Sequence, residues 1–188
     1  MELNFESAIV THCAPTLAGI KTANLFQFRH APIAAVRREV RHWDEKLSRQ
    51  GLRVKILKRC RAFDSCLIYV YRPGQLQRII SSPNTRAFLK GLGYIDENPT
   101  LILAQLSRRL CMSVEFPHEI GVFLGYPLDD VIGFIKNGGR NYTLSGYWKA
   151  YGNPEQAQAY FDLCRRCTES YCRHYEQGVS LLHLAVAA

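Results

Sequence analysis

Cys13, His118 and Glu119 are the residues of this chain whose types and surroundings could support covalent chemistry. A cysteine thiolate is a nucleophile, a histidine can act as its general base, and a carboxylate can orient the imidazole. Each of the three lies where an apolar run meets small or polar residues, and an ionisable group at such an edge is costly unless it is paired or used. The sequence therefore allows thiol-dependent acyl or amide transfer, with Cys13 as nucleophile, His118 as base and Glu119 orienting it.

The surroundings of Cys13 predict a thiol at the start of a helix. Residues 7–11 are a short apolar run that predicts a strand, and residues 13–16 predict the turn into a helix that continues to Phe28. The free N–H groups and the dipole at a helix N-terminus favour a thiolate and lower the thiol pKa. The alternative is a small buried thiol at a turn, because free cysteine is among the most buried residue types.

His118 precedes an apolar run, residues 120–124, that predicts a strand ending in Gly125-Tyr126. A histidine at the head of such a strand resembles the papain-like cysteine hydrolases, whose nucleophile lies earlier in the chain, and Asn141 and Trp148 are similar to two further residues of that fold. The resemblance is partial. No glutamine or asparagine closely precedes Cys13 as an oxyanion donor, and Cys13 lacks the Gly-Ser-Cys-Trp surroundings of that family.

A non-catalytic module that binds an anionic small molecule or a nucleotide is the alternative function. Residues 136–141 form a basic, glycine-rich turn that could present N–H groups and two cations to an anion. The turn matches neither the phosphate loop nor the dinucleotide glycine motif, so no cofactor is predicted, and a helix C-cap followed by a loop is its simpler interpretation. The candidate ligand-binding residues are Lys21, Asn24, Lys136, Arg140, Trp148 and Lys149.

The chain carries a net charge of +8 at an isoelectric point near 9.2, which favours an anionic partner. The basic residues lie in several short groups and no run of five occurs, so a solvated basic surface is the expected arrangement. Nucleic-acid binding is the less favoured function, because no recognised motif or aromatic platform is present. Nothing in the sequence specifies an oligomeric state.

Seven cysteines and an acidic N-terminus without a secretory signal predict reduced thiols in the cytoplasm. No apolar stretch approaches the roughly 20 residues that a membrane span needs. Cys164, Cys167 and Cys172 could suggest a metal site, but zinc sites place such pairs on turns and these lie in a predicted helix. We therefore predict no metal.

The remaining elements follow from local signals. Pro32 opens a helix that ends at Gly51, two β-rich runs at residues 53–58 and 66–71 predict an antiparallel hairpin, and residues 144–151 predict a strand. Proline at the first position predicts helices from residues 83, 99, 127 and 154, the last of them capped by Asn153. These elements predict one α+β domain over residues 1–188, with a small, mostly antiparallel sheet and several packed helices.

Three segments resemble a bacterial family known as domain of unknown function 3793. They are Cys-Ala-Pro-Thr-Leu-Ala-Gly-Ile-Lys within residues 13–26, Phe-Pro-His-Glu-Ile-Gly-Val-Phe-Leu-Gly-Tyr-Pro within residues 116–131, and Gly-Tyr-Trp-Lys-Ala-Tyr-Gly at residues 146–152. The resemblance implies that these residues are the ones to test, and it implies no activity, cofactor or substrate. We expect the first two segments to form one pocket lined by Cys13, Lys21, His118, Glu119 and Lys149.

Overall fold

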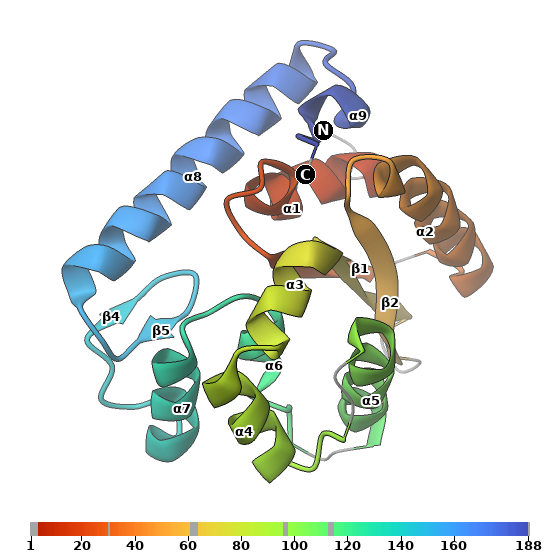
Figure 1. Cartoon of the computed structure of the whole chain (residues 1–188). Coiled ribbons are helices and arrows are strands. Elements are labelled where there is room, and N and C mark those ends of the chain that lie inside the picture. Colours follow the sequence, from red (N-terminus) through yellow and green to blue (C-terminus); the bar gives the residue numbers. More distant parts are fainter. Residues whose placement is uncertain (1–3, 30, 61–63, 96–97, 113–114, 188) are drawn as a thin grey trace.

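Three antiparallel strands, in the order β1-β3-β2, lie between two layers of helices (Figure 1). The strands are β1 (Ala23–Arg29), β2 (Arg53–Cys60) and β3 (Ser65–Tyr71). The computed structural model describes residues 4–29, 31–60, 64–95, 98–112 and 115–187. The predicted α+β class and the predicted hairpin of β2 with β3 are both confirmed.

Alternating side chains of the strands build a separate apolar cluster on each face of the sheet. On one face, Phe26, Ile68 and Val70 pack with α1 (Phe5–Leu17) and α2 (Ile33–Ser48). On the other, Tyr69 and Tyr71 pack with a second group of helices. These are α3 (Pro73–Ile80), α4 (Pro83–Gly91), α5 (Pro99–Met112), α6 (Ile120–Phe123) and α7 (Leu128–Asn137).

The C-terminal part runs along the side of these layers. A short hairpin, β4 (Leu144–Ser145) with β5 (Lys149–Ala150), precedes the long helix α8 (Pro154–Glu176). Helix α8 packs against α1, and α9 (Leu181–Leu184) returns the chain to α1, where the Val186 backbone N–H donates to the Leu17 carbonyl at 3.0 Å (Figure 1).

The helices predicted from first-position prolines are confirmed at Pro83, Pro99 and Pro154, and the helix predicted after Tyr126-Pro127 begins at Leu128. The side chain of Asn153 accepts hydrogen bonds from the backbone N–H groups of Glu155 and Gln156, as a capping residue should. Helix α3 carries the same signal at Pro73 and was not predicted.

The predicted strand at residues 7–11, the predicted turn at residues 13–16 and the predicted helix from that turn to Phe28 are wrong. The Asn4 side chain caps a helix that begins at Phe5 and ends at Leu17, and residues 23–29 are the strand β1. Ten of the thirteen residues of α1 are buried, because the sheet, α8 and α9 surround it, so its sequence lacks a helical period. The Arg72 guanidinium donates to the carbonyls of Thr16 and Leu17, at 2.8 and 2.7 Å, and closes the helix there.

Two further strand predictions are corrected. The apolar run after His118 is the helical turn α6, so the papain-like resemblance, which required a strand there, has no structural support. Residues 144–151 do not form one strand but a hairpin of two-residue strands, because the chain turns at Gly146. Glycine is needed there, since an added Cβ would collide with the ring of Phe161. Across the part of the chain that the structure describes, no helix has the length and apolar character needed to cross a membrane.

Candidate functional site

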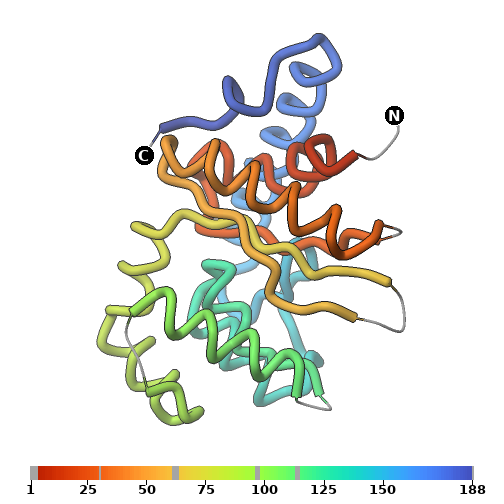
Figure 2. Tube along the Cα trace, turned by 90° about the vertical axis from the view of Figure 1, so that its right-hand side faces the viewer, coloured from red at the N-terminus to blue at the C-terminus, as the bar shows by residue number. Residues whose placement is uncertain are grey.

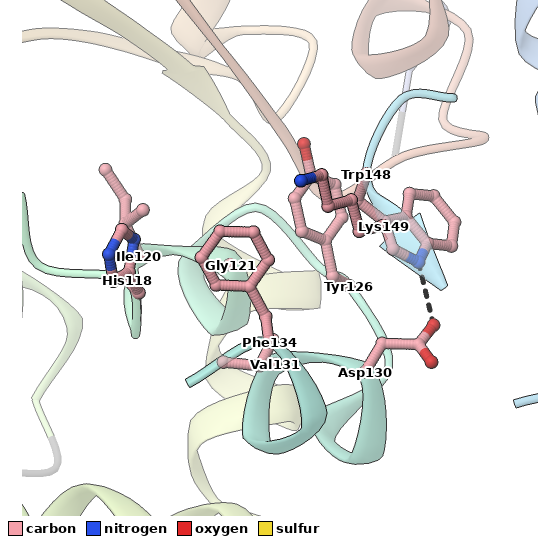
Figure 3. Close-up of a pocket in the computed structure, with 9 residues that line it drawn as sticks. All are labelled: His118, Ile120, Gly121, Tyr126, Asp130, Val131, Phe134, Trp148 and Lys149. Atoms are coloured by element: carbon pink, nitrogen blue, oxygen red, sulfur yellow. Dashed lines mark hydrogen bonds between the residues drawn. The ribbon is translucent and has the colours of Figure 1, made fainter. Parts of the chain in front are cut away.

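A pocket of about 160 Å³ lies where α6, α7 and the β4–β5 hairpin meet (Figure 3). Its mouth and walls come from two of the three segments noted in the sequence, together with Phe134 of α7. The residues that line it are His118, Ile120, Gly121, Tyr126, Asp130, Val131, Phe134, Trp148 and Lys149.

Tyr126 is the point at which all three segments meet. Its ring stacks on Trp148 of the hairpin, with centroids 4.8 Å apart and planes at 26°. On the first segment, the Lys21 Nζ lies 4.9 Å from the centroid of the Tyr126 ring. Gly125, at φ 78°, allows the chain to pass Thr22 so closely that an added Cβ would lie 2.8 Å from the Thr22 Cβ. The fold therefore brings Lys21 to a tyrosine that lies more than 100 residues later in the chain.

Asp130 fixes the hairpin against α7. Its buried carboxylate accepts hydrogen bonds from the Trp148 indole N–H at 2.7 Å and from the backbone N–H groups of Tyr151 at 2.7 Å and Gly152 at 3.2 Å. The first of these is the dashed line in Figure 3. The carboxylate thus sets the position of the Trp148 ring at the pocket wall.

Gly121 lets α6 approach α7 closely. A Cβ at this position would lie 2.8 Å from the Val131 Cγ2 and 3.1 Å from the Tyr126 Cδ2, closer than packed atoms tolerate. A larger residue would therefore push the two helices apart and open the pocket floor.

Aromatic rings form most of the pocket wall. The exposed His118 ring lies against Phe134, with centroids 4.8 Å apart and planes at 57°. Trp148 is held from behind by Phe161 in an edge-to-face contact at 4.6 Å. Rings held in this way can contact an apolar ligand without a further loss of side-chain freedom.

Lys149 supplies the positive charge of the pocket. Its ammonium donates to the Gly139 carbonyl at 2.7 Å and lies 4.9 Å from the ring centroid of Tyr142 and 5.8 Å from that of Phe134. Among the described residues it has no ion pair with a carboxylate. An ammonium has three N–H donors and the Gly139 carbonyl takes one of them, so Lys149 can also donate to an anionic group.

Lys136 lies in the last turn of α7, and Arg140 lies in the turn after that helix, next to Gly139; both basic side chains are exposed. They do not line the pocket, but the bond from Lys149 to Gly139 joins this turn to its wall. Their charges add to the positive potential around Lys149 at long range.

Lys21 is buried, with 3% of its surface exposed, and lies behind the Tyr126 ring rather than in the pocket. Burial lowers the pKa of its ammonium to about 8, although the nearby thiols of Cys13 and Cys164 partly oppose the shift. The group therefore titrates close to neutral pH.

Cys13 lies in the last two turns of α1 and is fully buried. The helix dipole at that end disfavours a thiolate, so the argument for a lowered pKa from a helix N-terminus is wrong. Burial raises the pKa of the Cys13 thiol, and the charge of Lys21 offsets only part of the increase. Cys13 also lies outside the pocket that contains His118.

Cys13 should accordingly be among the least reactive thiols of the folded protein. In native protein at pH 7.5, we expect iodoacetamide to modify Cys13 at least about tenfold more slowly than the exposed Cys111, because alkylation of a buried thiol must wait for opening of the fold. Mass spectrometry of labelled peptides measures both rates, and protein unfolded in urea provides the control in which they converge. Equal rates in native protein would restore Cys13 as a candidate nucleophile.

Glu119 and Asn24 have partners inside the protein. Glu119 is buried and accepts hydrogen bonds from the Arg109 guanidinium at 2.8 Å and from the Tyr94 hydroxyl at 3.1 Å. Asn24 accepts a hydrogen bond from the Thr16 hydroxyl at 2.6 Å, which ties β1 to α1. Neither side chain lines the pocket.

Of the residues singled out in the sequence, the structure brings His118, Trp148 and Lys149 together in the pocket. Sequence reasoning missed Tyr126 and Phe134, which complete the aromatic wall. Tyr126 stood within a quoted segment next to the helix-starting Pro127, whereas Phe134 gave no signal beyond an aromatic residue on a helix. Among the described residues, no group of three or more His, Cys, Asp and Glu side chains is arranged to hold a metal ion.

A family model described as Protein of unknown function (DUF3793) matches residues 9–185, and this confirms the resemblance seen in the three segments. No curated protein and no solved structure matches the chain.

Proposed function

The chain belongs to the DUF3793 family, and we propose that its pocket binds a small planar anion about the size of one aromatic ring. The ligand packs against the side chains of Tyr126, Trp148 and Phe134, and its negative group is held by the ammonium of Lys149. The protein acts in this role as a binding module.

The size of the pocket supports a single ring. A cavity of roughly 150 Å³ holds one benzene molecule, and this pocket measures about 160 Å³. Cavities that hold larger metabolites are usually about 300 Å³ or more. A nucleotide therefore fits only if most of it lies outside the pocket, with a base or another ring inserted.

The observation that carries the proposal is the Lys149 ammonium at an aromatic-walled pocket, without a carboxylate partner among the described residues. A cation at an apolar wall strongly attracts an anion, because little water competes for it. The exposed His118 lines the same pocket against Phe134 and can donate a hydrogen bond to a ligand there.

Thiol-dependent acyl transfer has less support from the geometry. Cys13 is fully buried outside the pocket, and the carboxylate of Glu119 is engaged by Arg109 and Tyr94. Of the three proposed catalytic groups, His118 alone lines the pocket. An imidazole that has no thiol beside it cannot activate Cys13 as a nucleophile.

Benzoate and phenyl phosphate should bind and change the fluorescence of Trp148. The chain has two tryptophans, so the Trp43→Phe background leaves Trp148 as the single reporter. In that background, we expect Lys149→Met to weaken benzoate binding about tenfold or more, because a hydrogen bond to a charged group contributes about 1.5–3 kcal/mol. Fluorescence titration and calorimetry measure the dissociation constants.

The matched control is Lys136→Met, which removes the same charge from an exposed position in the last turn of α7 and should change benzoate binding by less than about threefold. Benzamide has the same ring without the charge, so its binding should be weaker and indifferent to Lys149→Met. Equal affinity for benzoate and benzamide would contradict the anionic part of the proposal. Failure of every aromatic anion to saturate the Trp148 signal at millimolar concentration would contradict all of it.

A further inference from the structure

The whole net charge of the protein belongs to one segment. Residues 29–61 contain eleven Lys and Arg residues and three Asp and Glu residues. The other 155 residues contain thirteen of each, so they are neutral overall and the segment carries the entire +8. The basic residues look dispersed only when each short group is considered separately.

The fold places this segment on one side of the molecule. It comprises the end of β1, the helix α2 and the strand β2, and α2 lies along β2 (Figure 2). The apolar residues of α2 face the sheet, so its charged residues face solvent. The exposed basic side chains of this face are Arg29, Arg37, Arg38, Arg41, Lys46, Arg49, Arg53 and Arg59.

Side chains from α2 and β2 converge on this face. Arg37 of α2 and Arg59 of β2 both lie close enough to the Cys66 thiol of β3 for their charges to oppose the increase in its pKa that burial causes. We name the eight exposed basic side chains given above the α2–β2 face, since most of them belong to these two elements.

Acidic side chains neutralise little of this charge. Asp44 binds the Arg53 guanidinium through two bonds of 2.7 Å. Across the described residues, no other basic side chain of the α2–β2 face has an ion pair with a carboxylate. Positive charge concentrated in this way produces a field that attracts a polyanion and that salt screens.

We propose that the α2–β2 face binds the phosphate backbone of a nucleic acid. Eight of the eleven basic residues in the segment are arginine, whose planar guanidinium donates two parallel hydrogen bonds to a phosphate. The proposal is independent of the ligand pocket, which other elements form.

An anionic membrane fits the face less well. Peripheral membrane helices insert apolar side chains beside their basic ones. No large hydrophobic residue of α2 or β2 is exposed among the described residues, and the apolar residues Val36, Val40, Trp43 and Leu47 of α2 are buried in the core. The face therefore offers charge without an apolar anchor.

Two fluorescein-labelled probes test the proposal: a single-stranded RNA of 20 nucleotides and a DNA duplex of the same length. Their affinities distinguish an RNA backbone from a DNA backbone as the ligand. Fluorescence anisotropy of the full chain should show binding whose affinity falls steeply as salt increases. Replacing Arg37, Arg41 and Arg59 together with glutamate should weaken binding of the preferred nucleic acid at least about tenfold and reduce the salt dependence. Circular dichroism and urea unfolding verify that the variant is folded.

The matched control replaces the exposed Arg78, Arg166 and Arg173 with glutamate, which changes the net charge equally on other elements. This control should retain binding within about threefold. Equal loss in both variants would show attraction to net charge alone and overturn the proposal. It would also be overturned if neither oligonucleotide bound at low salt, or if vesicles containing phosphatidylserine bound through the three arginines while the oligonucleotides did not.

Discussion

The stability of the wild type, relative to a Lys21→Met variant, is expected to increase by about 2.5 kcal/mol between pH 7 and pH 10. Lys21 has a pKa of about 8 in the folded protein, because it is buried, and an ordinary value of 10.5 when exposed. Between these values the unfolded chain holds the proton and the folded protein does not. The free energy of unfolding therefore rises with pH in this window. The contribution of Lys21 reaches its full value above pH 10.5 and is lost as the pH falls towards 8.

Urea unfolding at pH 7, 8, 9 and 10 measures the free energy of unfolding of both proteins. The comparison with Lys21→Met is essential, because burial also raises the pKa of the Cys13, Tyr126 and Tyr160 side chains, and these groups reduce stability as the pH increases. They are present in both proteins and largely cancel. Lys136→Met removes an exposed lysine and should follow the wild type at every pH. Parallel curves for the wild type and Lys21→Met would show that the Lys21 pKa is unshifted.

Replacing Asp130 with alanine is expected to cost about 3 kcal/mol of stability and to release Trp148 from the pocket wall. The substitution leaves the Trp148 indole N–H and the Tyr151 backbone N–H without their acceptor, and an unpaired buried donor costs about 1–3 kcal/mol. Asp130→Asn should cost less. Its amide oxygen can replace one of the two acceptors, but its NH₂ group then faces the other donor.

The expected spectroscopic sign is a red shift of Trp148 emission in the folded Asp130→Ala variant, measured in the Trp43→Phe background, together with weaker benzoate binding. Asp129→Ala is the matched control, because Asp129 is exposed in the same first turn of α7. It should lose only its interaction with the helix dipole, about 0.3–1 kcal/mol. Similar losses in the two variants would mean that the bonds of Asp130 do not hold the hairpin.

Local signals in the sequence determined the elements that begin at a proline or a capping residue. The helices starting at Pro83 and Pro99, and the capped start of α8 at Asn153, were predicted within a residue or two. These signals act within a single turn. The first N–H groups of a helix have no partner inside it, so a proline that lacks an N–H, or a side-chain oxygen that accepts from one, suits this position wherever the helix lies in the fold. The hairpin of β2 and β3 followed from β-branched and aromatic residues on both sides of a short turn.

Short apolar runs were the elements that only the tertiary structure could decide. Residues 7–11 and 120–124 were predicted as strands, and both are helical. A run that is buried on all sides shows neither the period of a helix nor the alternation of a strand, so its conformation depends on the surfaces that cover it. For α1 those surfaces are the sheet, α8 and α9.

The candidate site was likewise predicted in part from the sequence and decided in part by the tertiary structure. Residue type alone selected His118, Trp148 and Lys149, which line the pocket, and also Cys13 and Glu119, which are buried elsewhere. Once residues 5–17 form a helix, Cys13 lies near its C-terminal end, where the dipole reverses the expected effect on the thiol. The sequence thus determined which groups could do chemistry. The packing of α6, α7 and the hairpin around Tyr126 decided which of them face one pocket, because contacts between residues so far apart in the chain arise only when the folded layers close on each other.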